Sequence, residues 1–155
     1  MDTTRLSQGQ MIAAVSAGLL FIFMFLPWLG FDVPEGVDLP SGLDESSNAW
    51  KATQSLDVYL FIVILSAVVP ALLAMGGNNA QLPFVGATTT FLLAVIGVLL
   101  IFVLMIDPDS AAGNLEVKIG LWLGLLATIG IAVGGYLAMQ DEAYGGGAAP
   151  PTDRY

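Results

Sequence analysis

Four long apolar segments dominate this 155-residue chain, and none of them has a charged residue in its interior. At 1.5 Å per residue, a helix of about 20 residues crosses the roughly 30 Å hydrocarbon layer of a bilayer. A soluble helix of that length would carry a polar stripe facing water, and these segments have none. The sequence therefore predicts four membrane-spanning helices, at about residues 11–30, 56–75, 84–106 and 119–139.

The connections between these segments predict how the helices are arranged. We expect an all-α fold, a four-helix transmembrane bundle in up-down-up-down order, because short connections join antiparallel neighbours. The longest connection, residues 31–55, forms an acidic loop between helices 1 and 2, and residues 46–52 within it suggest a short interfacial helix. The bundle is one domain over residues 1–139. The tail at 140–155 is too rich in Gly, Pro and acids to bury a core, and is expected to be disordered.

Composition excludes several kinds of protein. Only 11% of the residues are charged, and the 13 acids against 4 bases give a net charge of −9, which argues against binding nucleic acid. Cysteine and histidine are absent, which removes disulfides, the usual transition-metal and haem ligands, and two common catalytic groups. The acids flanking the last two spans match no calcium-loop pattern and are expected to be solvated. We expect no cofactor, no metal and no enzymatic activity.

The orientation in the membrane follows from very few basic residues. With four spans both termini lie on one side, where Arg5 and Arg154 oppose Lys51 and Lys118. Arg5 flanks the first span, which usually dominates orientation, and the acidic loop lacks the basic excess of a cytoplasmic loop. The prediction is a multi-pass protein of the cell membrane with both termini in the cytoplasm.

Glycines spaced four apart mark the fourth span as a packing helix. They are Gly120, Gly124, Gly130 and Gly134. Small residues at this spacing let two helix backbones approach closely in lipid, where packing drives association. The partner is either a helix of the same bundle, a second copy, or another membrane protein. A comparable seam on the third span suggests contact with the fourth, and its residues are Gly86, Thr90 and Ala94.

Three tryptophans flank the predicted spans. Trp28, Trp50 and Trp122 would all lie on the side of the acidic loop if the predicted topology holds. Tryptophan is enriched at membrane–water interfaces because its ring is apolar and its N–H is polar. We interpret all three as interface anchors.

Asp57 is the acid closest to the interior of a span. It falls in the first turn of the second span, beside Ser55, where capping and the helix dipole favour a carboxylate. An intramembrane acid is also a common functional residue, so contact with an ion or a partner is the alternative.

Two further local signals concern the helix ends and a kink. Pro70 lies inside the second span, where it removes a helix donor and should free the carbonyl of Ser66. The candidate N-caps of the first helix are Thr3, Thr4 and Ser7.

Three segments carry a resemblance to known proteins. They are FIFMFLPW at 21–28, Asn48-Ala49-Trp50 with Asp57 downstream, and the glycine-rich segment at 119–140. In these the chain resembles a group of uncharacterised small bacterial four-span integral membrane proteins. The resemblance implies a multi-pass inner membrane protein and brings no activity with it.

The function expected from these features is a non-enzymatic scaffold, accessory subunit or small homo-oligomer, because glycine seams occur without catalytic groups. The alternative is a small oligomeric transporter or channel, with the threonines at 88–90 and the kinked second span lining a path. A membrane enzyme ranks third, since it would have to rely on Asp57 or the loop acids without a histidine, cysteine or basic partner.

Overall fold

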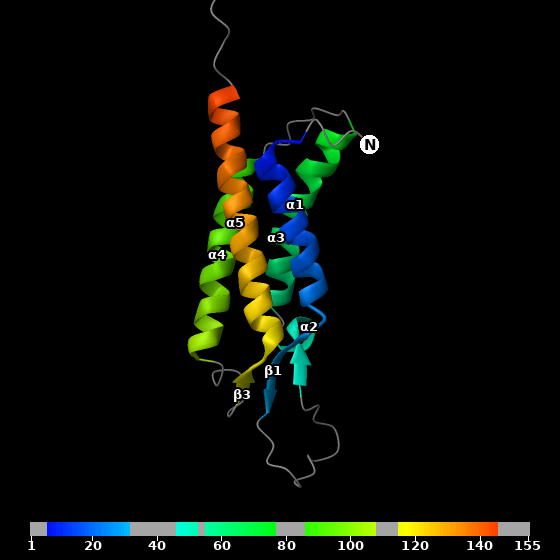
Figure 1. The fold of residues 1–155 in the computed structure, drawn as a ribbon. Coiled ribbons are helices and arrows are strands. Elements are labelled where there is room, and N and C mark those ends of the chain that lie inside the picture. The colour runs from blue at the N-terminus through cyan, green and yellow to red at the C-terminus, as the bar shows by residue number, and fades with distance from the viewer. Residues whose placement is uncertain (1–5, 32–45, 53–54, 77–85, 108–114, 146–155) are drawn as a thin grey trace, which may run out of the picture.

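The computed structural model describes residues 6–31, 46–52, 55–76, 86–107 and 115–145. Its elements, in chain order, are α1 (Gln8–Phe23), β1 (Pro27–Phe31), β2 (Ser46–Asn48), α2 (Ala49–Ala52), α3 (Leu56–Met75), α4 (Ala87–Ile106), β3 (Leu115–Val117) and α5 (Ile119–Gly145). Figure 1 shows the four longer helices side by side, with the strands and α2 at one end. This end is called the sheet end below. The described chain is mostly helical, as predicted.

Helices α3, α4 and α5 are each long and apolar enough to cross a membrane, which agrees with the second, third and fourth predicted spans. The predicted limits of α3 are confirmed, and α4 begins at Ala87 instead of residue 84. Helix α5 continues past residue 139 to Gly145, so the expected disorder of the tail is wrong for residues 140–145. Adding residues to an existing helix needs no new nucleation, and Ala, Gln and Glu are good helix formers. Residues 146–155 lie outside the described residues.

The first helix is shorter than predicted. The apolar run continues to residue 30, but α1 ends at Phe23 after 16 residues, a length of about 24 Å. Pro27 explains the early end, because proline has no N–H to donate and disfavours helical geometry in the residue before it. At its other end α1 starts with a capping box. Ser7 Oγ accepts the Gln10 N–H and Gln10 Oε1 accepts the Ser7 N–H, both at 3.2 Å. Of the three candidate caps, the structure selects Ser7.

The all-α expectation missed a three-stranded antiparallel sheet. Its strand order is β2-β1-β3, and Leu29 at its centre pairs with Ser47 on one side and Val117 on the other. The carbonyl of Trp28 also accepts the backbone N–H of Lys118 at 2.9 Å. Residues 46–52, predicted as a short helix, are half strand and half helix. Strands of three to five residues are too short to show an alternating pattern in the sequence.

Helix α5 packs against α1 and α4, and α3 packs against the same two helices. The core uses many small side chains, among them Ala13, Ala17 and Ala94, with Leu20, Leu60 and Ile131 filling the space between helices. On each of the four longer helices the outward faces are apolar, with large exposed side chains such as Ile22, Leu72, Val103 and Leu126.

Candidate functional site

The second pair of α5 glycines lies against α1. A Cβ atom on Gly134 would meet the backbone N of Ala13, and would lie 2.8 Å from both Ala13 Cα and Gly9 O. A Cβ on Gly130 would meet Ser16 Oγ, with Ser16 Cβ at 3.0 Å. These distances are too short for real side chains, so the two helices are in near backbone contact. This face of α5 is therefore covered by α1 of the same chain.

Sequence reasoning overlooked the other half of this seam. Gly9, Ala13 and Ala17 on α1 are all buried, and a Cβ on Gly9 would meet the backbone of Ala138. Their spacing of four is the same small-residue signal that singled out α5. The pattern was therefore readable from the sequence, although it contains only one glycine.

The first pair of α5 glycines forms a slot for the indole ring of Trp28. A Cβ on Gly124 would lie 2.6 Å from Trp28 Cζ2, and one on Gly120 would lie 2.7 Å from Trp28 Cδ1 and 2.5 Å from Pro27 O. Trp28 is only 1% exposed. The prediction that Trp28 anchors the chain at a surface interface is therefore wrong, because its ring fills the space that the glycines leave.

The other two tryptophans also lie at the sheet end, and both are less buried than Trp28. Trp122, in the first turn of α5, is 53% exposed, as an interface anchor would be. Trp50 is half-buried between Phe25 and Phe61, with ring centroids 6.0 and 6.2 Å away. Its indole N–H and the side-chain oxygen of Asn48 are buried atoms without a hydrogen-bond partner.

A threonine of α4 satisfies the carbonyl that Pro70 frees. Thr90 Oγ1 donates to the Ser66 carbonyl at 2.7 Å, in a buried contact between α4 and α3. The sequence predicted the free acceptor but not its donor, and it assigned Thr90 to contact with the fourth span. Gly86 of the same predicted seam has open space around it. Instead, α4 meets α5 where a Cβ on Gly135 would lie 3.0 Å from the backbone N of Phe91.

Three further hydroxyls also donate to helix carbonyls, two within their own helix and one to a neighbouring helix. Ser66 Oγ donates to the Val63 carbonyl and Thr128 Oγ1 to the Gly124 carbonyl, both at 2.8 Å. Tyr59 Oη donates across to the Leu93 carbonyl of α4 at 2.7 Å. Each of these hydroxyls is therefore engaged with a backbone carbonyl.

Asp57 lies in the first turn of α3, directly after the N-cap residue Ser55 and Leu56. Its Oδ1 accepts the backbone N–H of Val58 at 2.7 Å, while the Ser55 side chain makes no capping bond. The carboxylate thus accepts one of the N–H groups that the helix start leaves without an intrahelical partner. Within the described ranges no three metal-ligating side chains come together.

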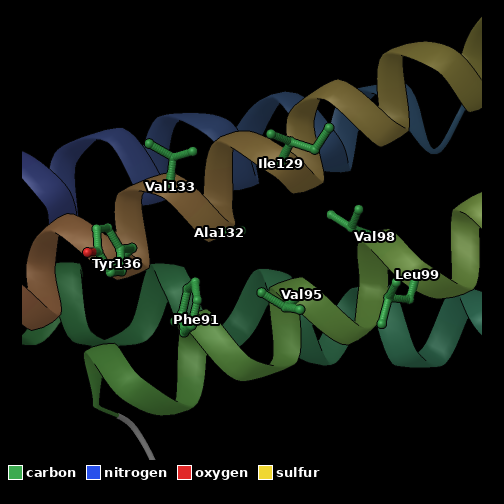
Figure 2. A pocket seen from close by; sticks show the side chains of 8 residues that line it. All are labelled: Phe91, Val95, Val98, Leu99, Ile129, Ala132, Val133 and Tyr136. Atoms are coloured by element: carbon green, nitrogen blue, oxygen red, sulfur yellow. The ribbon is translucent and has the colours of Figure 1, made fainter.

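An apolar groove lies between α4 and α5 on the outside of the molecule (Figure 2). Its volume is about 350 Å³. The residues lining it are Phe91, Val95, Val98, Leu99, Ile129, Ala132, Val133 and Tyr136. The Tyr136 hydroxyl is the one polar side-chain group among them.

Comparison of the chain with protein-family models, with curated proteins and with solved structures finds no match in any of the three. The resemblance to small four-span bacterial membrane proteins therefore stays a prediction.

Proposed function

We propose that this is a multi-pass protein of the cell membrane that acts by contact, as a scaffold, accessory subunit or small homo-oligomer, and not by catalysis. Its four longer helices cross the bilayer in alternating directions, with both termini in the cytoplasm. The membrane placement is supported by the three long apolar helices and by the large apolar side chains exposed on all four. Helix α1 is short for a span, and the turn and strand that follow it complete the crossing.

The observation that favours a contact function is the use of four hydroxyls, those of the buried residues Ser66, Thr90 and Thr128 and of half-buried Tyr59. Tyr59, Ser66, Thr90 and Thr128 all donate to helix carbonyls. A solute path needs polar groups that face a lumen, and catalysis needs groups free to meet a substrate. Hydroxyls that are bonded to the backbone serve helix packing instead. Because the Thr90 hydroxyl is bonded in this way, the arrangement favours the contact function over a transporter that uses Thr90 to line its path.

The partner surface we propose is the sheet-end half of the outer face of α5. The glycine faces of this helix are already covered by α1 and Trp28. Ile119, Trp122 and Leu126 remain exposed at 60, 53 and 62%. An exposed apolar stripe that includes a tryptophan suits contact with a helix of another membrane protein or of a second copy.

Photo-crosslinking in native membranes tests this proposal. A photoreactive amino acid at Leu126 should give one discrete product of fixed mass, while the same group at Leu72, exposed at 54% on α3, should not. Equal crosslinking from both positions would contradict the assigned surface.

Reconstitution of the purified protein into lipid vesicles provides a second test of the contact function. Proteoliposomes of the purified chain should release entrapped potassium and a small neutral sugar no faster than empty vesicles. Protein-dependent release of either one would overturn the contact function in favour of a channel or transporter.

A further inference from the structure

The groove between α4 and α5 has the length of an acyl chain within one leaflet. From Phe91 to Leu99 it follows nine residues of α4, a rise of about 12 Å, against roughly 15 Å for half of the hydrocarbon layer. One end of the groove lies one turn inside the start of α4, at Ala87. The groove therefore occupies the half of the molecule that is away from the sheet end (Figure 1).

Polarity changes along the groove in one direction only. Ala132 lies in its wall between bulkier side chains, and the Tyr136 hydroxyl points away from the other lining residues at the end near Phe91 (Figure 2). Beyond Tyr136, α5 continues to the exposed acids Asp141 and Glu142. A molecule that matches this order has an apolar tail, a polar junction and a positively charged end.

We propose that the groove binds one acyl chain of a zwitterionic aminophospholipid. The tail lies along Ala132, the ester and phosphate region lies beside the Tyr136 hydroxyl, and the headgroup amine lies at the negatively charged end of α5, which carries Asp141 and Glu142. Tyrosine suits this position because its ring is apolar and its hydroxyl is polar. The acids disfavour an anionic headgroup by like-charge repulsion. This inference rests on the membrane placement proposed above.

The test uses phosphatidylethanolamine with a photoreactive diazirine on one acyl chain, added to vesicles that contain the full-length protein. Adduct positions are mapped by mass spectrometry. Adducts at Phe91 and Tyr136 should exceed those at Leu72 on α3 several-fold. Excess unlabelled phosphatidylethanolamine should reduce the groove adducts more than excess phosphatidylglycerol does, and this competition needs no variant.

The variant Ala132→Phe fills the groove and should remove most adducts there while leaving those at Leu72. Ile96→Phe, on α4 at the depth of the groove but outside its lining, is the matched control and should label like the unchanged protein. Adducts of equal yield on all exposed apolar residues would overturn the inference, as would equal competition by the two lipids. A crosslinked second copy at the groove in place of lipid would also overturn it. Absence of adducts everywhere, including Leu72, would instead contradict the membrane placement.

Discussion

At the scale of single residues, the absence of a side chain decides how closely α5 approaches its neighbours. Gly134 faces the backbone of Ala13, where even a methyl group has no room. A Cβ atom on Gly18 of α1 would have no neighbouring atom within 4 Å. Two glycines in packed helices of one chain thus have opposite roles, and only their surroundings tell them apart.

We expect Gly134→Ala to lower the free energy of unfolding by about 1–3 kcal/mol, because the new Cβ forces α1 and α5 apart. Gly18→Ala is the matched control. It should be neutral or stabilise the protein by up to about 1 kcal/mol, since alanine is the better helix former. Unfolding of the purified protein in mixed detergent micelles measures both variants. Equal effects of the two substitutions would contradict the close helix contact.

Two substitutions of Asp57 distinguish a helix-capping role from a functional acid. Asp57→Asn should cost little stability, because the amide oxygen can still accept the Val58 N–H. Asp57→Leu should cost about 1 kcal/mol, since that N–H loses its acceptor. Detergent unfolding measures the stability, and crosslinking from Leu126 measures partner contact. Loss of the crosslinked product in Asp57→Asn at unchanged stability would favour a functional acid.

At the scale of the elements, each of two prolines leaves a helix carbonyl without its usual backbone N–H donor. In both cases a side chain from outside that helical turn donates to the carbonyl instead. Pro27 cannot donate to the Phe23 carbonyl, which instead accepts the Leu26 N–H at 3.1 Å and the Trp28 indole N–H at 2.8 Å. Pro70 cannot donate to the Ser66 carbonyl, which accepts from Thr90. One proline ends a helix, whereas the other lies within a helix that continues.

A double-mutant cycle tests the second replacement. Thr90→Val should destabilise the protein by about 1 kcal/mol, because it removes the donor to the Ser66 carbonyl while keeping the shape of the side chain. Pro70→Ala restores a backbone N–H four residues after Ser66. In that background the cost of Thr90→Val should fall by roughly 0.5 kcal/mol or more. Strict additivity in detergent unfolding would show that the two sites do not share this acceptor.

At the scale of the whole molecule, the small sheet joins the helix ends. Strand β1 follows α1, β2 leads through α2 towards α3, and β3 precedes α5, so these ends meet at one place. Helix α1 therefore runs towards the sheet end, while α3 and α5 run away from it (Figure 1). The sheet end and the C-terminal end of α5 therefore lie at opposite ends of the helix bundle (Figure 1).

This arrangement predicts which positions react on which side of a membrane. The chain has no cysteine, so single-cysteine variants can be labelled without background. In sealed vesicles, Ser46→Cys and Glu116→Cys should react with an impermeant maleimide from one side, and Asp141→Cys from the other. All three sites are exposed. Labelling of Ser46→Cys and Glu116→Cys from opposite sides would contradict the proposed topology.

Features that depend on neighbours along the chain could be predicted from the sequence. The apolar runs predicted the three long helices, and Pro70 predicted a free carbonyl at Ser66, because hydropathy and a missing donor are local properties. Ser7 was among the predicted caps for the same reason.

Contacts between groups that are distant in the sequence depend on the tertiary fold. Nothing local to residue 28 shows that the Trp28 ring enters a slot between α5 glycines, and nothing near Ser66 shows that Thr90 is its donor. The three-stranded sheet depends on the same kind of contact, since strand pairing joins residues 29 and 117. Such contacts form because each freed carbonyl and each apolar surface needs a partner, and chain geometry, not sequence proximity, selects that partner.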